Sequence, residues 1–557
     1  MFRRRPELLI VLLALAVATL VRGLLLLSGS VSFHSDEAVV SLMARHILQG
    51  ARPVFFYGQA YMGSLDAWLV AIGFALLGES VLTVRIVQSV LYLLAVGSGT
   101  LAAWKLSGRW WVTLVAGLAL SVPPVLFALY TTATLGGYNE MLVLGHLLLI
   151  LGYDVTHAHP RSFWRWAALG ACAGLGFWTH GLIIVYLLPV GLLILRHFSR
   201  QQAPCYALAA LAAIMLSAPW WVYDLQHDHA ALSFYLFNRH SDELAGMTTV
   251  PTSPGQRMLR LGIFNLPAVI GMRFPWNSSY FLLPVGLLVL MVFVLAVFTL
   301  ARRSDLLAPD GQLVVLGLLI SHTVILISVR FGADISGRYM LPMLLPLAIA
   351  LGVLTERLRE VGRGGWWALP SALVIGYFAA GQAAAVTSDA GVTTQFDLVS
   401  HIPNDHDDAL IEFLDAQGIA HGYTNYWVAF RLAFLSQERI QLDPALPYKS
   451  DLSYDPGDRR FQPYLEATAR ADRIAYITTE HLPALDELLL ARLDSAGITY
   501  RQHKIGPYHV YYDFSRRVSP RELGFGATSS RPTNANRDGM PAISALYHVD
   551  CCETVAR

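Results

Sequence analysis

The chain has 557 residues, of which 55% are hydrophobic and only 14% are charged, and its formal net charge at pH 7 is +1. An ordinary soluble domain is about one quarter charged, so this composition excludes a soluble protein and predicts a membrane protein with several spans. The near-neutral charge excludes the basic balance typical of nucleic-acid-binding proteins. The four cysteines have no spacing typical of a zinc site or a disulfide framework.

Long apolar runs predict the membrane spans. They occur near residues 7–27, 81–104, 110–129, 141–153, 204–222, 280–301, 311–329, 340–355 and 366–386. Two shorter runs, 166–179 and 181–196, meet at His180 and fit either two short spans or one re-entrant pair; counting two predicts about eleven transmembrane helices. The first run is too long for a signal peptide and no small-residue cleavage site follows it, so we interpret it as an uncleaved span.

Charges between the runs predict the orientation. With eleven spans, the basic clusters fall on one side, which by the positive-inside rule is the cytoplasm. These clusters are Arg3–Arg5, Lys105 and Arg109, Arg161 and Arg165, Arg196 and Arg200, Arg302 and Arg303, and Arg357, Arg359 and Arg363. The opposite side receives Asp36, Glu37, Asp66, Glu79, Glu140, Asp224, Asp228, Asp242, Glu243 and Asp334. We therefore expect a cytoplasmic N-terminus, with everything after Ala390 outside the cytoplasm.

Two long loops are predicted on the outer side. The first runs from about Ser28 to Ser80 and contains an apolar segment, 65–78, that is too short to span and that we expect in the membrane interface. The second covers about 223–279, where TTVPTSPGQR (248–257) indicates a mobile flap. In this loop His227 and His229 flank Asp228, which resembles a metal cluster only weakly.

The composition changes after residue 390, where charges become frequent and apolar residues periodic. We predict a membrane domain over 1–390, a small α/β domain over 391–518 and a disordered tail over 519–557. In the α/β domain, helices are expected at 407–419, near 425–435 and at 481–497, with strands after residue 419, near 438–442 and at 473–479. The segments ITYRQHKI and YHVYYDF are expected to form a closing hairpin.

The first outer loop contains most of the candidate site residues. Asp36 and Glu37 are adjacent carboxylates at the predicted membrane surface, where a carboxylate can act as a general base or hold a divalent cation. They also fit a helix start in which Ser35 or Asp36 is the N-cap and Glu37 lies in the first turn. In FFYGQAYMGSLDA (55–67), the side chains of Tyr57, Gln59, Tyr61 and Asp66 suit a sugar site, although aromatic residues also anchor interfacial helices.

Three later positions add candidates. In TLGGYNE (134–140), two glycines allow close backbone approach beside Tyr138 and Glu140, although a carboxylate also suits a helix start. In ISGRYMLP (335–342), Arg338 beside Tyr339 could pair with a lipid phosphate or simply reach the headgroups. His180 lies at a helix break in an apolar region, where a histidine is often functional.

Four stretches together resemble a known family. They are FHSDEA after the first span, FFYGQAYMGSLDAW, LGGYNE and SGRYMLPMLLPLA. They are similar to bacterial membrane glycosyltransferases of the C-type (GT-C) superfamily, related to protein O-mannosyltransferases and to the lipid A aminoarabinose and galacturonic acid transferases. The resemblance covers roughly residues 1–355 and extends more loosely into 408–440.

This resemblance implies the reaction, the partners and the location. Members take a sugar from a polyprenyl-phosphate donor and pass it, with inversion, to a lipid, glycan or protein acceptor on the outer face, among membrane lipids. Asp36 would be the general base, and Arg338, by its position, would hold the lipid phosphate. The Glu-Lys-Pro of the aminoarabinose transferases is absent, so Asp66 or Glu140 is the candidate for a second acid. Metal use varies in the superfamily, which leaves a divalent cation as a candidate cofactor. The implied location is the inner (plasma) membrane, with a periplasmic or extracellular C-terminal domain.

Two other function classes remain open. A transporter or flippase of lipid-linked sugars would place charged residues near span centres and show repeated halves with broken helices, whereas here the acids cluster in outer loops and no internal repeat is visible. A non-catalytic scaffold for envelope assembly would tolerate loss of Asp36 without loss of sugar transfer. The sequence favours an enzyme over both.

Overall fold

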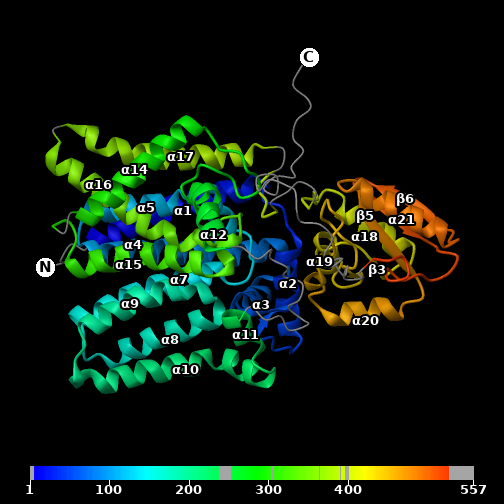
Figure 1. Cartoon of the computed structure of the whole chain (residues 1–557), viewed down its shortest axis with the longest axis horizontal. Helices are drawn as coiled ribbons and strands as arrows, with labels where there is room; N and C mark the ends of the chain where they lie inside the picture. The colour runs from blue at the N-terminus through cyan, green and yellow to red at the C-terminus, as the bar shows by residue number, and fades with distance from the viewer. Residues whose placement is uncertain are drawn as a thin grey trace, which may run out of the picture.

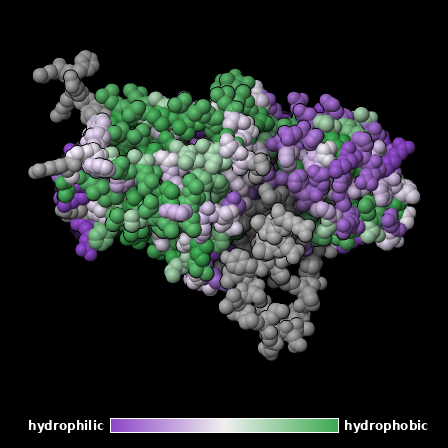
Figure 2. Space-filling view, turned by 90° about the horizontal axis from the view of Figure 1, so that it is seen from above, coloured by the Kyte–Doolittle hydropathy of each residue, from purple (hydrophilic) through white to green (hydrophobic). Residues whose placement is uncertain are grey.

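The computed structural model describes residues 6–237, 253–302, 305–362, 364–388, 391–395 and 400–525. A bundle of long helices and a smaller domain built on a five-stranded sheet lie end to end (Figure 1). Figure 2 shows apolar residues over most of the helical part and hydrophilic residues over most of the smaller domain. The first half of the predicted flap (248–252), Arg3–Arg5 and the chain beyond residue 525 lie outside the described residues.

Eight helices of the described chain are long and apolar enough to cross a membrane. They are α1 (Pro6–Leu27), α4 (Val81–Ser107), α7 (Tyr138–Tyr153) with its following turn, α10 (Ala203–Gln226), α14 (Leu283–Arg302), α15 (Pro309–Ser328), α16 (Leu344–Val361) with its preceding turn, and α17 (Leu369–Val386). The other three predicted runs contain α5 (Trp110–Ser121), α8 (Phe163–Thr179) and α9 (Ile184–Arg196), which have 12, 17 and 13 residues. The count of eleven spans therefore stays a prediction.

One predicted run is interrupted. The stretch 110–129 was expected to be continuous, but it forms α5 and the short α6 (Val125–Tyr130). Pro123 and Pro124 separate them, because proline lacks the N–H that a continuing helix needs. The runs 166–179 and 181–196 form α8 and α9, which a 3-10 turn (Gly181–Ile183) joins next to His180.

The core of the helical part forms around α16, whose apolar window is buried along its whole length. This helix packs against α5 and α14, while α4 packs against α1, α5 and α7. Helices α8 and α10 approach each other closely, because a Cβ on Gly170 or Gly174 would collide with the backbone oxygens of Ala209 and Ala213. Small residues at such contacts let two membrane helices pack backbone to backbone.

The described charges of the helical part gather at its two ends. At the end remote from the smaller domain, Lys105 Nζ lies 2.6 Å from Asp154 Oδ1, and Arg109 Nη1 lies 3.6 Å from Glu356 Oε1. That basic end thus also contains acids, which form ion pairs with some of its basic residues. Asp36 and Asp334 lie at the other end, where they line cavities next to the smaller domain. Which end faces the cytoplasm stays a prediction.

The first loop folds into a compact unit. It consists of α2 (Ser35–Leu48), the antiparallel pair β1 (Phe55–Phe56) and β2 (Gln59–Gly63), and α3 (Leu65–Leu77). The segment expected in the membrane interface is thus a helix, α3, and it packs against α2 and α4. The second loop forms α11 (Ala230–Phe237), α12 (Pro254–Arg260) and α13 (Leu266–Val269), and a capping box of Ser253 and Gln256 makes the last residues of the predicted flap the start of α12.

The C-terminal domain has the predicted α/β pattern. Its elements are α18 (Asp407–Ala416), β3 (His421–Tyr423), α19 (Tyr426–Leu435), β4 (Gln441–Asp443), α20 (Gln462–Arg470), β5 (Ile474–Thr479), α21 (Pro483–Ser495), β6 (Arg501–Ile505) and β7 (Tyr508–Tyr512). The sheet order is β4-β3-β5-β7-β6, with β3 parallel to β4 and β5 and the hairpin antiparallel. Helix α20 was not predicted. The packed chain also continues past the expected boundary at 518, because Leu523 and Phe525 are buried in the domain core.

Helix α19 joins the domain to the first loop. It packs directly on α2, and the ring of Phe434 lies 5.5 Å from that of Phe33 and 6.1 Å from that of Phe74. Beside it, the carboxylate of Glu438 contacts His46 Nε2 at 3.0 Å and Arg45 Nη1 at 3.4 Å. Apolar contacts and ion pairs together hold the two parts in one arrangement.

Candidate active site

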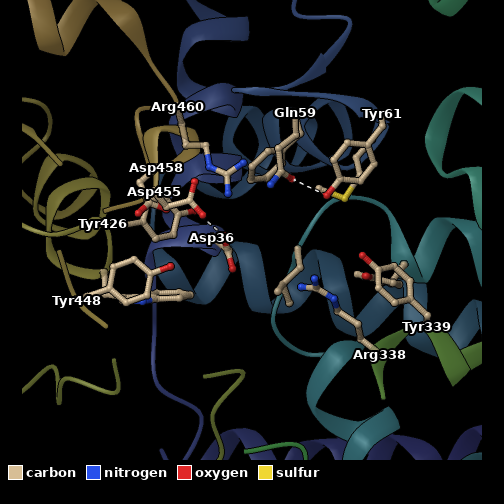
Figure 3. A pocket seen from close by; sticks show the side chains of 15 residues that line it. Asp36, Gln59, Tyr61, Arg338, Tyr339, Tyr426, Tyr448, Asp455, Asp458 and Arg460 are labelled. Atoms are coloured by element: carbon tan, nitrogen blue, oxygen red, sulfur yellow. Dashed lines mark hydrogen bonds between the residues drawn. The ribbon is translucent and has the colours of Figure 1, made fainter. Parts of the chain in front are cut away.

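A cavity of about 270 Å³ lies where the helical part meets the C-terminal domain (Figure 3). Its wall is formed by Asp36, Phe56, Gln59, Tyr61, Met62, Leu135, Tyr138, Arg338, Tyr339, Tyr426, Trp427, Tyr448, Asp455, Asp458 and Arg460. A second cavity of about 350 Å³ adjoins it and shares Asp36, Leu135, Arg338, Trp427 and Tyr448. Six of the predicted site residues therefore line the first cavity: Asp36, Gln59, Tyr61, Tyr138, Arg338 and Tyr339.

Asp36 lies in the first turn of α2 and is partly exposed to the cavity. The helix begins at Ser35, and its N-cap is His34 without a side-chain cap. The expectation that Ser35 or Asp36 is the N-cap was therefore wrong, because both side chains are directed to the C-terminal domain. The Tyr426 hydroxyl donates a hydrogen bond of 2.5 Å to Asp36 Oδ1, and the Ser35 hydroxyl donates one of 2.6 Å to the Tyr426 carbonyl.

Glu37, the neighbouring carboxylate, points away from the cavity. It is completely buried, and its Oε2 accepts a hydrogen bond of 2.8 Å from Arg85 Nη2. Burial raises the pKa of Glu37 to about 7, although the charge of Arg85 opposes this. This geometry is that of a buried ion pair between α2 and α4, so the two adjacent carboxylates have different surroundings.

Arg338 begins the 3-10 turn η7 (Arg338–Met343), which leads into α16. Its Nη2 pairs with Asp334 Oδ2 at 2.9 Å, and its guanidinium lies 5.1 Å from the ring centre of Tyr339. Asp334 is in turn held by the backbone N–H of Ser336, at 2.7 Å. Figure 3 shows Arg338 reaching into the cavity from the side opposite Tyr426, with Asp36 between them.

The C-terminal domain supplies the remaining charges. The Arg460 guanidinium lies 5.3 Å from the ring centre of Tyr426, and it donates to Gln59 when the Gln59 amide turns its oxygen toward it. Although burial opposes it, the pKa of Arg460 is raised above its usual range by its neighbours Tyr426, Asp36 and Asp458. The pKa of Asp458 is raised by burial and by the nearby Asp455. One wall of the cavity is therefore a dense group of opposite charges.

Two predicted site residues near this cavity support its walls from behind. The Tyr57 hydroxyl lies 3.0 Å from His46 Nδ1, and its ring stacks on that of Phe461 at 4.7 Å. The ring of His180 lies 4.9 Å from the ring of the cavity residue Tyr138, and His180 Nδ1 accepts from the backbone N–H of Leu182. Neither Tyr57 nor His180 lines either cavity.

Asp66 and Glu140, the candidates for a second acid, are buried outside both cavities. Asp66 Oδ2 accepts from the Thr134 hydroxyl at 3.0 Å, and burial raises the pKa of Asp66. The glycines between them permit the close approach that the sequence predicted: Gly137 has a φ of +85°, and a Cβ there would lie 2.6 Å from Thr179 Cγ2. This packing sets the start of α7 and thereby the position of Tyr138.

The residues that weakly resemble a metal cluster in the sequence, His227, Asp228 and His229, do not converge. His227 stacks on Tyr223, with ring centres 3.8 Å apart, and His229 Nδ1 contacts Asp224 Oδ2 at 3.0 Å, so they do not share a point with Asp228. Within the ranges that the structure describes, only one group of three His, Cys, Asp or Glu ligand atoms is compact enough for a metal ion, and it lies outside the cavity. A divalent cation at Asp36 therefore stays a prediction.

No protein-family model matches the chain. The chain is 28% identical to undecaprenyl phosphate-α-4-amino-4-deoxy-L-arabinose arabinosyl transferase 2 of Pseudomonas fluorescens over 309 residues, which is 53% of this chain and 47% of that protein. It is 26% identical over 339 residues to the corresponding transferase of Pseudomonas aeruginosa, covering 58% of this chain and 56% of that protein. The chain thus matches about half the length of these curated relatives.

Solved structures match more of the chain. ArnT from Cupriavidus metallidurans in the apo state has a TM-score of 0.58 at 15% identity, covering 91% of this chain and 97% of that one. The chain therefore has the same overall fold as this transferase structure. The apo oligosaccharyltransferase of Archaeoglobus fulgidus is also similar, with a TM-score of 0.51 at 12% identity and coverage of 86% and 70%. The predicted resemblance to GT-C glycosyltransferases is confirmed by these relatives, while the low identities to the solved structures establish only the fold.

The sequence-based prediction missed the contribution of the C-terminal domain. Tyr426, Trp427, Tyr448, Asp455, Asp458 and Arg460 all line the cavity, and none of them was a predicted site residue. One signal was available: YKSDLSYDPGDRR (448–460) has six charged residues and two tyrosines in a segment without helical or strand period. Binding residues are often found on such loops.

Proposed function

We propose that the chain is a membrane glycosyltransferase that moves a sugar from a polyprenyl-phosphate donor to an envelope acceptor, on the outer face and with inversion at the anomeric carbon. The observation that supports this best is that Asp36 and Arg338, from distant parts of the chain, line the same cavity. The named relatives are undecaprenyl phosphate-linked arabinosyl transferases, and one ArnT structure is bound to undecaprenyl phosphate, which favours this class of donor.

The position of the cavity suits an amphipathic donor. It lies between helices with apolar surfaces and a hydrophilic domain (Figure 2). A polyprenyl chain stays in the lipid while its phosphate and sugar remain at the surface, so a site at this junction meets both parts of the donor. The orientation predicted from the basic clusters places this junction on the outer side.

The reaction needs a base and a cation, and the cavity contains both. Asp36 accepts the proton of the acceptor hydroxyl while that oxygen bonds to the anomeric carbon. The bond between the anomeric carbon and the phosphate oxygen breaks, and its electron pair leaves with the polyprenyl phosphate. Arg338 pairs with the phosphate and stabilises the charge that develops there. Attack from the face opposite the leaving phosphate inverts the anomeric carbon.

The two adjoining cavities suit two substrates. Because Asp36 and Arg338 belong to both walls, a donor in one cavity and an acceptor in the other would meet between the base and the cation. The first cavity has the aromatic rings of Tyr61, Tyr138 and Tyr339 on one side, which suit the apolar faces of a sugar. Its other side has the carboxylates and the guanidinium of the C-terminal domain, which suit sugar hydroxyls.

Sugar transfer by the purified chain in lipid tests this proposal. Radiolabelled polyprenyl-phosphate sugars are supplied with envelope extracts. Wild type is compared with Asp36→Asn and with Asp513→Asn, which changes an ion-paired aspartate that lines neither cavity. Wild type and Asp513→Asn should transfer label, whereas Asp36→Asn should lose about 100- to 10,000-fold in rate. Equal transfer by a folded Asp36→Asn would refute the role of the base. Passage of intact donor across the bilayer without transfer would instead favour a flippase.

A further inference from the structure

At the end of the helical part that is remote from the cavity, two histidines and an aspartate lie close together. His157 belongs to the π-helical turn η1 (Asp154–Ala158) after α7, His197 is the C-cap of α9, and Asp310 lies in the first turn of α15. One ligand atom of each lies within 4.8 Å of the other two. Three separate elements thus bring two imidazoles and one carboxylate to a single point, and π-helical turns occur often at functional sites.

Both imidazoles face the same carboxylate oxygen. His157 Nε2 lies 2.9 Å and His197 Nε2 lies 2.5 Å from Asp310 Oδ2, and the two imidazole ring centres are 5.0 Å apart. A tetrahedral Zn²⁺ binds imidazole nitrogens and carboxylate oxygens at about 2.0–2.2 Å, so its ligand atoms lie about 3.3 Å apart. The three side chains would need to separate by less than about 1 Å to admit the ion.

Contacts behind the ligands favour a metal ion over a simple hydrogen bond. His157 Nδ1 lies 3.1 Å from the Tyr153 carbonyl oxygen, to which it can donate, and 2.9 Å from the Thr156 hydroxyl, whose own proton is directed to the Gly152 carbonyl at 2.9 Å. When Nδ1 carries the proton, Nε2 has a lone pair, which repels the Asp310 oxygen unless a cation or a second proton lies between them. Arg196 Nε lies 3.0 Å from the other oxygen, Asp310 Oδ1, which leaves Oδ2 as a single ligand atom.

We propose that His157, His197 and Asp310 bind a Zn²⁺-class transition-metal ion, whose fourth position is open to solvent beside the exposed His157. This ion would connect three helices whose other ends lie near the cavity: Tyr138 lines it, and His180 packs against Tyr138. Helix α7 begins at Tyr138, α9 follows His180, and α15 leads to Arg338. At 1.5 Å per residue, the ion lies about 28 Å from Tyr138 along α7, so it acts on the frame and touches no substrate.

Metal binding by the full chain tests this proposal independently of sugar transfer. The protein, without a polyhistidine tag, is stripped with a chelator in detergent and titrated with Zn²⁺ alone, then with Co²⁺ alone as a spectroscopic probe. Wild type should bind one ion per chain, show the visible absorption of tetrahedral Co²⁺, and melt at a higher temperature with the metal than without it. Both His157→Ala and His197→Ala should weaken binding by at least about tenfold, since even outer-shell changes cost that much.

His229→Ala is the matched control, because it removes a histidine that also contacts an aspartate, Asp224, but has no third ligand. It should bind Zn²⁺ as wild type does. His157→Gln, with a polar side chain at an exposed position, gives a second variant whose folding is checked by its metal-free melting temperature. Equal Zn²⁺ affinity in wild type and the histidine variants, or no binding by wild type at micromolar Zn²⁺, would overturn the proposal. The three side chains would then only form hydrogen bonds with one another.

Discussion

The phenol of Tyr426 donates a hydrogen bond to Oδ1 of Asp36, and this contact joins the C-terminal domain to the first loop. The Ser35 hydroxyl returns a bond to the Tyr426 carbonyl at 2.6 Å, so the two segments hold each other in both directions. The orientation of the proposed base therefore depends on a domain that lies far away in the sequence. The domain is part of the site and does more than cover it.

Tyr426→Phe tests this relationship, because it removes the hydroxyl and keeps the ring. Sugar transfer should fall about 10- to 100-fold, since a hydrogen bond to a charged group contributes about 1.5–3 kcal/mol. Initial rates with saturating donor measure the effect, and Tyr500→Phe, which changes a tyrosine that does not line the cavity, serves as the control. An unchanged rate in a folded Tyr426→Phe variant would show that Asp36 does not need this donor.

Substitutions of the two adjacent carboxylates, Asp36 and Glu37, should affect stability differently. Glu37→Ala leaves Arg85 buried without its partner, so the free energy of unfolding should fall by about 3–5 kcal/mol. Asp36→Asn should lower it by only about 1 kcal/mol, because the amide oxygen can still accept from Tyr426 and the side chain faces a cavity. Thermal unfolding in detergent measures both variants. Similar stability of Glu37→Ala and wild type would mean that the Glu37–Arg85 pair contributes nothing to the fold.

Arg338 should prove sensitive even to a conservative change. Arg338→Ala should lower kcat/KM for the donor about 100- to 1,000-fold, because the phosphate loses its cation in the transition state. Arg338→Lys should recover only part of this loss, since an ammonium keeps the charge but cannot pair bidentately. Arg473→Ala, which changes an exposed arginine of the C-terminal domain, is the control. Full activity of Arg338→Lys would indicate that charge alone is needed.

The contact between the first loop and the C-terminal domain can be tested through Glu438, because the contribution of this residue to stability depends on pH. Burial would raise its pKa, but hydrogen bonds from His46 and Tyr464 and the charge of Arg45 hold the pKa of Glu438 at about 2. A lowered pKa gives stability that is complete above about pH 4.5 and is lost as the pH falls toward 2. Glu438→Gln should therefore cost about 1–2 kcal/mol at pH 7, allowing for partial exposure, and progressively less below pH 4.5.

Melting temperatures of wild type and Glu438→Gln at pH 7, 5 and 3.5 measure this difference. Glu466→Gln is the control, because Glu466 pairs with Arg470 on the surface of α20 and has a side chain that is 50% exposed. A Glu438→Gln difference that stays constant over this pH range would contradict the ion-pair network between the first loop and the domain.

The sequence by itself determined those features of the protein that a pattern within one segment encodes. Apolar runs predicted most of the long helices, and periodicity predicted β5, α21 and the closing hairpin, because each signal lies within one segment. Asp36 was a candidate because two adjacent carboxylates lie at the start of the first outer loop, and Arg338 because a guanidinium can pair with a lipid phosphate. The interruption of the run 110–129 at Pro123 was also local and could have been predicted.

Only the tertiary structure decided which carboxylate faces the cavity and what surrounds it. Successive residues of a helix point about 100° apart, so the docking of α2 against α4 and α19 sends Glu37 into the core and Asp36 into the cavity. Tyr426 has no local pattern that marks a site, and Tyr426 and Arg460 come close to Asp36 only because the domain folds back onto the first loop. Contacts between residues almost 400 positions apart arise from packing, which no single segment encodes.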